Sequence, residues 1–172
     1  KTGVMILSRE ELARQAGVWK AAGKRVVFTN GCFDLIHLGH VRYLEEARAL
    51  GDVLVLGLNS DSSVRQLKGP QRPLVNEQER AALMSALRPV DHVVIFEELT
   101  ADNILLELKP AIYVKGGDYS LSDAADTATH KPKPLPEEPT VRSYGGQVVL
   151  TPFLPGHSTT DLIRHILQVF KQ

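Results

Sequence analysis

The chain has 172 residues, of which 43% are hydrophobic and 23% charged, enough for one globular domain with its own core. Twenty basic and twenty acidic side chains cancel, which argues against broad nucleic-acid binding but leaves room for a local basic pocket. A single cysteine, the absence of an apolar run near the roughly 20 residues of a membrane-spanning helix, and no recognisable signal peptide together predict a cytoplasmic protein.

Helix-like and strand-like patterns alternate along the chain. Helices are predicted at 8–22, 41–50, 76–87, 100–108 and 158–170, with Ser8 and Thr100 as caps of the first and fourth. Strands are predicted at 25–29, 52–58, 92–96, 111–115 and 147–150. The alternation indicates an α/β fold: one Rossmann-like domain over 1–172, with a five-stranded parallel sheet, helices on both faces and an N-terminal helix within 1–23. Ligands of such sheets bind at the carboxyl ends of the strands, here after the first, fourth and fifth.

One segment, 120–143, does not fit this alternation. It holds four prolines within eight residues, 132–139, a density that predicts neither helix nor central strand. Connections of this length are usually functional or disordered. We interpret the segment as a Pro-rich, mobile or lid-like insertion close to the expected site.

The strongest motif runs from Thr29 to His40, with the sequence TNGCFDLIHLGH. It begins where the first predicted strand ends and leads into the next helix. His37 and His40 lie three residues apart and so share one face of the first helical turn. Two imidazoles beside the positive end of a helix dipole suit a triphosphate, and the glycines allow backbone amides to approach it. They could stabilise charge that develops on the α-phosphorus.

Two other interpretations of these residues stay open. The histidines could be ordinary surface residues, since short motifs produce false positives. Alternatively, Asp34, His37 and His40 could bind a metal, because together they supply oxygen and nitrogen donors. A metal-dependent hydrolase would then be possible.

The segment resembles the H-x-G-H signature of the nucleotidyltransferase superfamily, which includes cytidylyltransferases. Further segments match in order: KGPQRP at 68–73 before NEQER at 76–80, YVKGGDY at 113–119, YGG at 144–146 and GHSTTDLIR at 156–164. The resemblance spans about Lys24 to Leu167. Within the superfamily these motifs are most similar to those of the bacterial heptose 1-phosphate adenylyltransferases, which make ADP-heptose for lipopolysaccharide.

The resemblance implies a role for each matching residue. Expected catalytic residues are His37, His40 and Lys68. Expected nucleotide-binding residues are Asn30, Gly31, Cys32, Phe33, Gly39, His40, Lys115, Gly117, Asp118, Ser158, Thr159, Thr160 and Arg164. Expected acceptor-binding residues are Asp34, Asn59, Asp61 and Arg80, and no residue is assigned as a metal ligand.

The implied reaction is transfer of AMP from ATP to a sugar phosphate, with a heptose 1-phosphate first among the acceptors. The acceptor phosphate is already ionised, so catalysis should rest on positioning and charge neutralisation, with Mg²⁺ on the phosphate oxygens. The alternative within the superfamily is a cytidylyltransferase for glycerol 3-phosphate or a similar alcohol phosphate. A regulatory module that only binds nucleotide is a further alternative, and relatives suggest a homo-oligomer without nucleic-acid or membrane partners.

Overall fold

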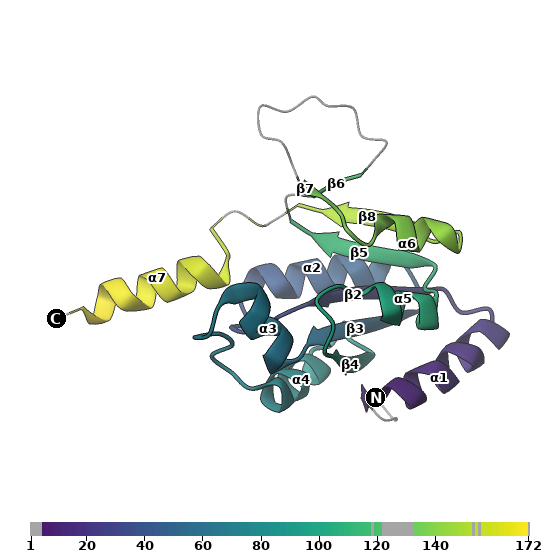
Figure 1. Cartoon of the computed structure of the whole chain (residues 1–172), viewed down its shortest axis with the longest axis horizontal. Helices are drawn as coiled ribbons and strands as arrows, with labels where there is room; N and C mark the ends of the chain where they lie inside the picture. The colour runs from purple at the N-terminus through teal and green to yellow at the C-terminus, as the bar shows by residue number, and fades with distance from the viewer. Residues whose placement is uncertain (1–4, 118, 122–132, 153, 155, 172) are drawn as a thin grey trace.

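The computed structural model describes residues 5–117, 119–121, 133–152, 154 and 156–171. Its centre is a six-stranded sheet in the order β1-β4-β3-β2-β5-β8, with every neighbouring pair parallel (Figure 1). The strands are β1 (Ile6–Leu7), β2 (Val26–Gly31), β3 (Val53–Asn59), β4 (His92–Phe96), β5 (Ile112–Gly116) and β8 (Gln147–Thr151).

The predicted α/β class is confirmed, but the sheet has one strand more than the predicted five. The added strand is β1, in which Ile6 pairs with Val93 and Leu7 with Val94 of β4. A two-residue strand carries too few positions for a period to be visible in the sequence.

Seven helices are assigned among the described residues: α1 (Arg9–Ala21), α2 (Leu38–Ala49), α3 (Asp61–Lys68), α4 (Glu77–Ala86), α5 (Asp102–Leu108), α6 (Glu138–Ser143) and α7 (Thr159–Phe170). Ser8 caps α1 and forms the predicted capping box with Glu11. The predicted cap Thr100 is wrong, because Ala101 is the N-cap of α5 and the Thr100 hydroxyl donates to Asp102 instead.

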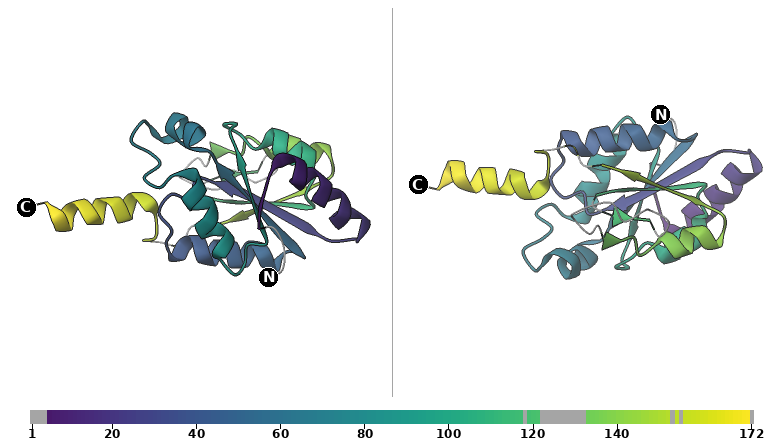
Figure 2. Two further views of the ribbon diagram at one scale, coloured as in Figure 1. Left: turned by 90° about the horizontal axis from the view of Figure 1, so that it is seen from below. Right: turned by 90° about the horizontal axis from the view of Figure 1, so that it is seen from above.

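Both faces of the sheet are covered, because alternate residues of each strand enter two separate cores. Figure 2 shows the strands between two groups of helices. On one face, Phe28 and Val55 pack in a core with residues of α1, α5 and α6. On the other, Val27 and Leu54 pack with residues of α2 and α4.

The second part of the Pro-rich segment belongs to the folded domain. β6 (Tyr119–Ser120) pairs with β7 (Lys133–Pro134), and α6 follows. Leu135 is 2% exposed and Val141 fully buried, so this part packs on the core. The prediction that the prolines exclude a helix is wrong here, because Pro139 lies in the first turn of α6, where its missing N–H costs no hydrogen bond. Residues 122–132 of the insertion lie outside the described part of the chain.

The strand order changes direction between β2 and β5. From β2 the chain adds β3 and β4 on one side and then crosses to place β5 on the other. The carboxyl ends of β2 and β5 therefore border the crevice where sheets of this kind bind ligands. α7 begins beside this edge and extends away from the rest of the molecule in every view (Figures 1 and 2).

Candidate active site

The two motif histidines meet at the start of α2. His37 is the N-cap residue, and the rings of His37 and His40 stack with their centroids 3.8 Å apart. The backbone N–H of His37 donates to Nδ1 of His40 over 3.4 Å. Because Nδ1 is the acceptor, the proton of the neutral His40 ring is placed on Nε2, which makes Nε2 a donor.

The pKa values of both imidazoles are lowered, which favours their neutral forms in the ligand-free protein. Burial, with a smaller effect of His37, lowers the pKa of His40 to about 4. The pKa of His37 is also lowered, mainly by burial and then by the neighbouring His157. An anionic ligand would oppose both effects, so the pair can gain positive charge when a phosphate binds.

His157 is a third histidine at this place, for which the sequence motifs predicted no role. A Cβ atom added to Gly39 would lie 3.0 Å from Nδ1 of His37 and 3.2 Å from Cβ of His157, so the glycine fills the gap between them. The hydroxyl of Thr159 donates to the carbonyl of Leu35 over 3.4 Å. The N-termini of α2 and α7 therefore face the same edge. The signal that could have identified His157 is its place next to Ser158 in the second motif.

The loop after β2 is surrounded by positive charge. Burial raises the pKa of the Cys32 thiol, while the charges of Lys68, Arg80, Lys115 and Arg72 act in the opposite direction. Four cations thus surround this loop in a chain whose net charge is zero. A raised thiol pKa disfavours Cys32 as a nucleophile. Arg72 and Arg80 are paired with Asp34 and Asp61, so Lys68 and Lys115 are the better candidates among the four for binding an anion.

Gly31 and Phe33 shape the loop itself. Phe33 adopts a positive φ of 44°, and a Cβ on Gly31 would lie 2.9 Å from its ring. The ring of Phe33 packs against that of His40, with 5.2 Å between centroids. The glycine therefore provides space for Phe33, which in turn supports one of the two histidines.

Asn30 and Lys115 lie on the two strands that border the crevice. Oδ1 of Asn30 accepts from the hydroxyl of Tyr113 at 2.7 Å and from Nζ of Lys115 at 3.0 Å. From α2, the Tyr43 hydroxyl contacts Thr29 and donates to the carbonyl of Val114. These contacts connect β2, β5 and α2 at the carboxyl edge and hold the Lys115 ammonium there.

Asp34 is buried, and its carboxylate is hydrogen-bonded within the protein. It is 2% exposed, its carboxylate accepts from Nε of Arg72 at 2.6 Å, and the amides of Leu74 and Val75 each donate to it over 2.9 Å. Burial acts to raise its pKa, but these hydrogen bonds outweigh it and the pKa is lowered. The carboxylate fixes the segment before α4, which favours a structural role over the acceptor contact expected from the sequence.

Arg80 is likewise held inside the protein. Its side chain is fully buried and donates to the carbonyls of Cys32, Asn59 and Val75 and to the carboxylate of Asp61, over 2.6 to 2.9 Å. The amide of Asn59 donates to Ser63 over 2.7 Å. Arg80 therefore ties together the ends of β2 and β3, which again favours a structural role over contact with the acceptor.

The second motif begins α7 as an ordinary helix cap. The Ser158 hydroxyl accepts from the amide of Asp161 and donates to its carboxylate, and Arg164 pairs with Asp161 at 2.8 Å. Thr160 and Arg164 are exposed. The backbone amides of this first turn remain a suitable phosphate site, while Arg164 would have to leave Asp161 to reach a ligand.

Three further residues were expected at the site, of which two are described. Lys68 lies outside every helix predicted from the sequence, but it is the last residue of α3, with Gly69 as C-cap, and it is exposed. Gly117 follows β5 with a φ of 125° and donates to the carbonyl of Thr151. Asp118 lies outside the described residues.

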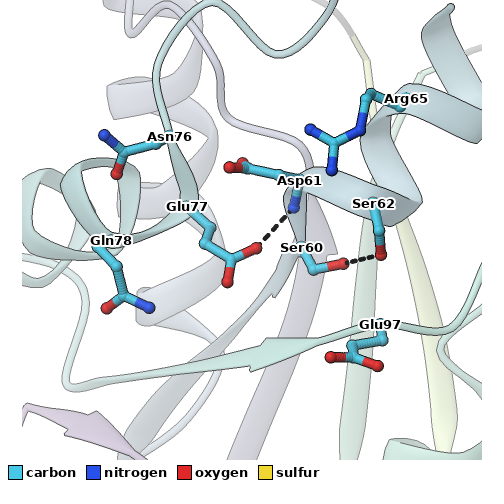
Figure 3. Close-up of a pocket in the computed structure, with 8 residues that line it drawn as sticks. All are labelled: Ser60, Asp61, Ser62, Arg65, Asn76, Glu77, Gln78 and Glu97. Atoms are coloured by element: carbon cyan, nitrogen blue, oxygen red, sulfur yellow. Dashed lines mark hydrogen bonds between the residues drawn. The ribbon is translucent and has the colours of Figure 1, made fainter. Parts of the chain in front are cut away.

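A separate pocket of about 450 Å³ opens at the carboxyl ends of β3 and β4 (Figure 3). In it the carboxylate of Glu77 accepts from the amide of Asp61 over 2.7 Å, and the hydroxyls of Ser60 and Ser62 are 3.0 Å apart. Its lining is polar and consists of Ser60, Asp61, Ser62, Arg65, Asn76, Glu77, Gln78 and Glu97. Of the expected acceptor residues, only Asp61 lines it.

The metal-site interpretation lacks a set of ligands. In the described part of the chain, no group of three or more His, Cys, Asp or Glu side chains could hold a metal ion. Asp34, which that interpretation requires, is bound to Arg72 instead. None of the helices in this part of the chain is both long and apolar enough to cross a membrane.

Comparison with known proteins identifies a family and several relatives of this chain. Residues 28–165 match the family model described as cytidylyltransferase-like. Proteins called "Bifunctional protein HldE" from Trichlorobacter lovleyi and Pelobacter propionicus are 51% and 52% identical to this chain. Each match covers 95% of this chain but only 31% of the relative, so the chain spans less than a third of these relatives' length.

Two solved structures are similar as well. A lipopolysaccharide core biosynthesis protein from Thermoplasma volcanium has a TM-score of 0.58 and 30% identity, with 77% of this chain and 98% of that one covered. A pantoate–β-alanine ligase from Francisella tularensis, complexed with β-γ ATP and β-alanine, has a TM-score of 0.54, with 99% of this chain and 80% of that one covered. At 10% identity the second likeness concerns the fold alone.

Proposed function

Because this chain belongs to the cytidylyltransferase-like family, we propose that it is a nucleotidyltransferase that transfers AMP from ATP to a sugar phosphate. The acceptor we propose is a heptose 1-phosphate, which gives ADP-heptose and pyrophosphate. One observation carries the proposal: the N-termini of α2 and α7 face one edge of the sheet, with His37 and His40 on the first and the hydroxyls of the second motif on the other.

The chemistry follows from these groups. The acceptor phosphate attacks the α-phosphorus of the nucleotide, the new P–O bond forms, and the bond to the leaving pyrophosphate breaks. Nε2 of His40 donates a hydrogen bond to a phosphate oxygen as negative charge develops there. His37 lies against it and acts on the same phosphates.

Cations and helix amides hold the rest of the triphosphate. Lys68 and Lys115 are proposed to neutralise the phosphates, since both lie near the loop at Cys32. The first turn of α7, with Ser158, Thr159 and Thr160, is proposed to hold the leaving pyrophosphate. Arg164 joins them if phosphate replaces its contact with Asp161.

Mg²⁺ fits this site as an ion held by the nucleotide. Because the described residues offer no cluster of protein ligands, it would be bound mainly by phosphate oxygens, as is usual for this metal. When bound, it would neutralise charge on the phosphates. The protein's own contribution is the set of histidine, lysine and amide donors.

The acceptor assignment rests on the relatives and on the pocket that Asp61 lines. The match to a protein whose name refers to lipopolysaccharide core biosynthesis supports a sugar acceptor. The pocket at Asp61 offers carboxylates and hydroxyls, which suit sugar hydroxyl groups. The description of the family as cytidylyltransferase-like supports the alternative of CTP with glycerol 3-phosphate. A homo-oligomer in the cytoplasm, without nucleic-acid or membrane partners, completes the proposal.

The test is a pyrophosphate-release assay with Mg²⁺, in which ATP and CTP are each combined with heptose 1-phosphates of both anomers and with glycerol 3-phosphate. Turnover with ATP and one heptose 1-phosphate supports the proposal and identifies the anomer. Turnover only with CTP and an alcohol phosphate keeps the mechanism and replaces the substrate pair. Nucleotide binding without any turnover would instead support a binding module.

A further inference from the structure

The side-chain amide of Asn30 is held by two hydrogen bonds to the same atom. Phe28 of β2 pairs with Tyr113 of β5. Because side chains two positions apart share a face of a strand, Asn30, Tyr113 and Lys115 lie on one face of the sheet. Oδ1 of Asn30 accepts from the Tyr113 hydroxyl at 2.7 Å and from Nζ of Lys115 at 3.0 Å. The three polar groups thus form one chain of hydrogen bonds at the carboxyl ends of β2 and β5.

The contact with Lys115 decides which way the Asn30 amide is turned. An ammonium group can only donate, so the atom that it touches is the amide oxygen, and the other atom is the NH₂ nitrogen. Nδ2 donates to no residue in the described part of the chain, and it is not one of the buried atoms there that lack a partner. Although Asn30 is only 8% exposed, its NH₂ group therefore reaches solvent, at the strand end that borders the crevice.

Tyr113 is a rigid support for this amide. The side chain is fully buried, and its ring stacks on that of Phe28 with 6.1 Å between centroids. Burial raises the pKa of the Tyr113 hydroxyl, which therefore keeps its proton and stays a donor at neutral pH. Because packing fixes the ring, the hydroxyl has one place to donate, and the Asn30 amide turns to meet it.

We propose that Tyr113 is a positioning residue, whose hydroxyl holds the Asn30 amide with its oxygen on the Lys115 ammonium and its NH₂ group toward a phosphate of the bound nucleotide. A phosphate oxygen is the acceptor that suits an NH₂ donor beside an ammonium group. The inference rests on the proposed function for the identity of the ligand. It gives a role to a residue that does not touch the ligand and for which the sequence motifs predicted none.

Tyr113→Phe tests the role, because it removes the hydroxyl and keeps the buried ring. The NH₂ signals of Asn30 in ¹⁵N NMR of the substrate-free protein, identified by their loss in Asn30→Ala, should change from rigid in wild type to mobile in Tyr113→Phe. The Kd for α,β-methylene ATP with Mg²⁺, measured by calorimetry, should rise about threefold to tenfold, the effect of one misplaced hydrogen bond. Equal rigidity of the Asn30 amide in both proteins would overturn the proposal.

Two further variants separate positioning from a structural role. Tyr144→Phe is the matched control, because Tyr144 packs on the same core but its buried hydroxyl has no hydrogen-bond partner among the described residues. It should leave the Asn30 signals and the Kd unchanged. In an Asn30→Ala background, Tyr113→Phe should change the Kd by less than about twofold, since no amide is left to orient. Weakening by the same factor in both backgrounds would show a merely structural role and overturn the proposal.

Asn30→Asp tests the direction of the NH₂ group and does not depend on how well Tyr113→Phe folds. Aspartate keeps the shape and the acceptor for Tyr113 and Lys115, but an anionic oxygen replaces the NH₂ donor. Facing a phosphate, it should raise the Kd at least about tenfold. In wild type, the NH₂ signals should shift when the ATP analogue and Mg²⁺ are added. A Kd within about twofold of wild type, or NH₂ signals that stay in place while nucleotide binds, would overturn the proposal.

The comparison of amide mobility uses no nucleotide, so it tests the link between Tyr113 and Asn30 separately from the reaction. If wild type bound no ATP analogue, the proposed function would fail. A mobile Asn30 amide in Tyr113→Phe would then still support the positioning role of the hydroxyl.

Discussion

At the scale of single residues, burial of the histidine pair makes the folded protein sensitive to acid. An unfolded histidine takes up a proton near its ordinary pKa of about 6.5, whereas the pKa of folded His40 is about 4. Between these pH values the unfolded chain binds more protons than the folded protein. The contribution of His40 to the free energy of unfolding is therefore fully present above about pH 6.5 and is lost as the pH falls toward 4. The lowered pKa of His37 acts in the same direction.

We therefore expect His40→Asn to lose less stability than wild type between pH 7.5 and pH 5. Urea unfolding at the two pH values measures the difference, and the same variant should lose most of its turnover. His165→Asn is the control, because His165 is exposed on α7 and should leave the acid sensitivity at the wild-type level. Equal acid losses in His40→Asn and wild type would mean that folding does not lower the pKa of His40.

Gly39 is a second position where one atom should matter. A Cβ there would lie 3.0 Å from His37 and 3.2 Å from His157, so Gly39→Ala must displace an imidazole or separate α2 from α7. We expect turnover to fall by about tenfold to a hundredfold, since small displacements of catalytic groups have effects of that size. Gly17→Ala on α1, with nothing within 4 Å, should keep full activity and gain about 0.5–1 kcal/mol of stability. Unchanged kinetics in Gly39→Ala would show that the spacing is not critical.

At the scale of elements, the long apolar runs were predictable and the short polar pieces were not. β3 is buried at every position and was readable as a central strand from its sequence alone. α3 (Asp61–Lys68) was missed because its sequence, DSSVRQLK, has only two apolar residues. The stability of such a helix comes from its cap at Ser60 and from tertiary packing, neither of which forms a periodic pattern. Lys68 consequently falls outside the helices predicted from the sequence.

Arg80 of α4 holds the ends of β2 and β3 together, and its replacement distinguishes this structural role from binding of the acceptor. Arg80→Lys keeps the charge but cannot reach the carbonyls of Cys32, Asn59 and Val75 together with Asp61. Because buried acceptors then lose their partners, we expect a loss of about 2–4 kcal/mol in the free energy of unfolding, measured by urea denaturation. If Arg80 binds the acceptor instead, stability should stay the same and only the KM for the acceptor should rise.

At the scale of the whole molecule, the sequence identified the residues within each motif but not the contacts between motifs. The signature at His37 and His40 was visible because its members are neighbours in the chain. His157 meets Gly39 only after the sheet has formed, because the two residues are far apart in the chain. The burial of Asp34 and Arg80 and their internal hydrogen bonds were not predictable for the same reason. The sequence does not show whether a charged side chain is buried.

The arrangement of α7 predicts which part of the molecule opens first. None of its residues is buried, and Ile166, Leu167, Val169 and Phe170 are 43% to 78% exposed. By contrast, all seven residues of β3 are buried. Because local opening is easiest where few apolar groups are buried, the amides of α7 should exchange with deuterium far faster than those of β3 in dilute protein.

Nucleotide should change this pattern, because phosphate bound at the first turn of α7 would stabilise the helix from its anchored end. Hydrogen exchange followed by mass spectrometry, with and without Mg²⁺ and a non-hydrolysable ATP analogue, should show protection rising in α7 while β3 is unchanged. Protection of α7 in ligand-free protein that grows with protein concentration would show that a second copy covers its apolar side chains. Protection equal to that of β3 at every dilution, with or without nucleotide, would mean that α7 packs against the domain in solution and does not extend from it.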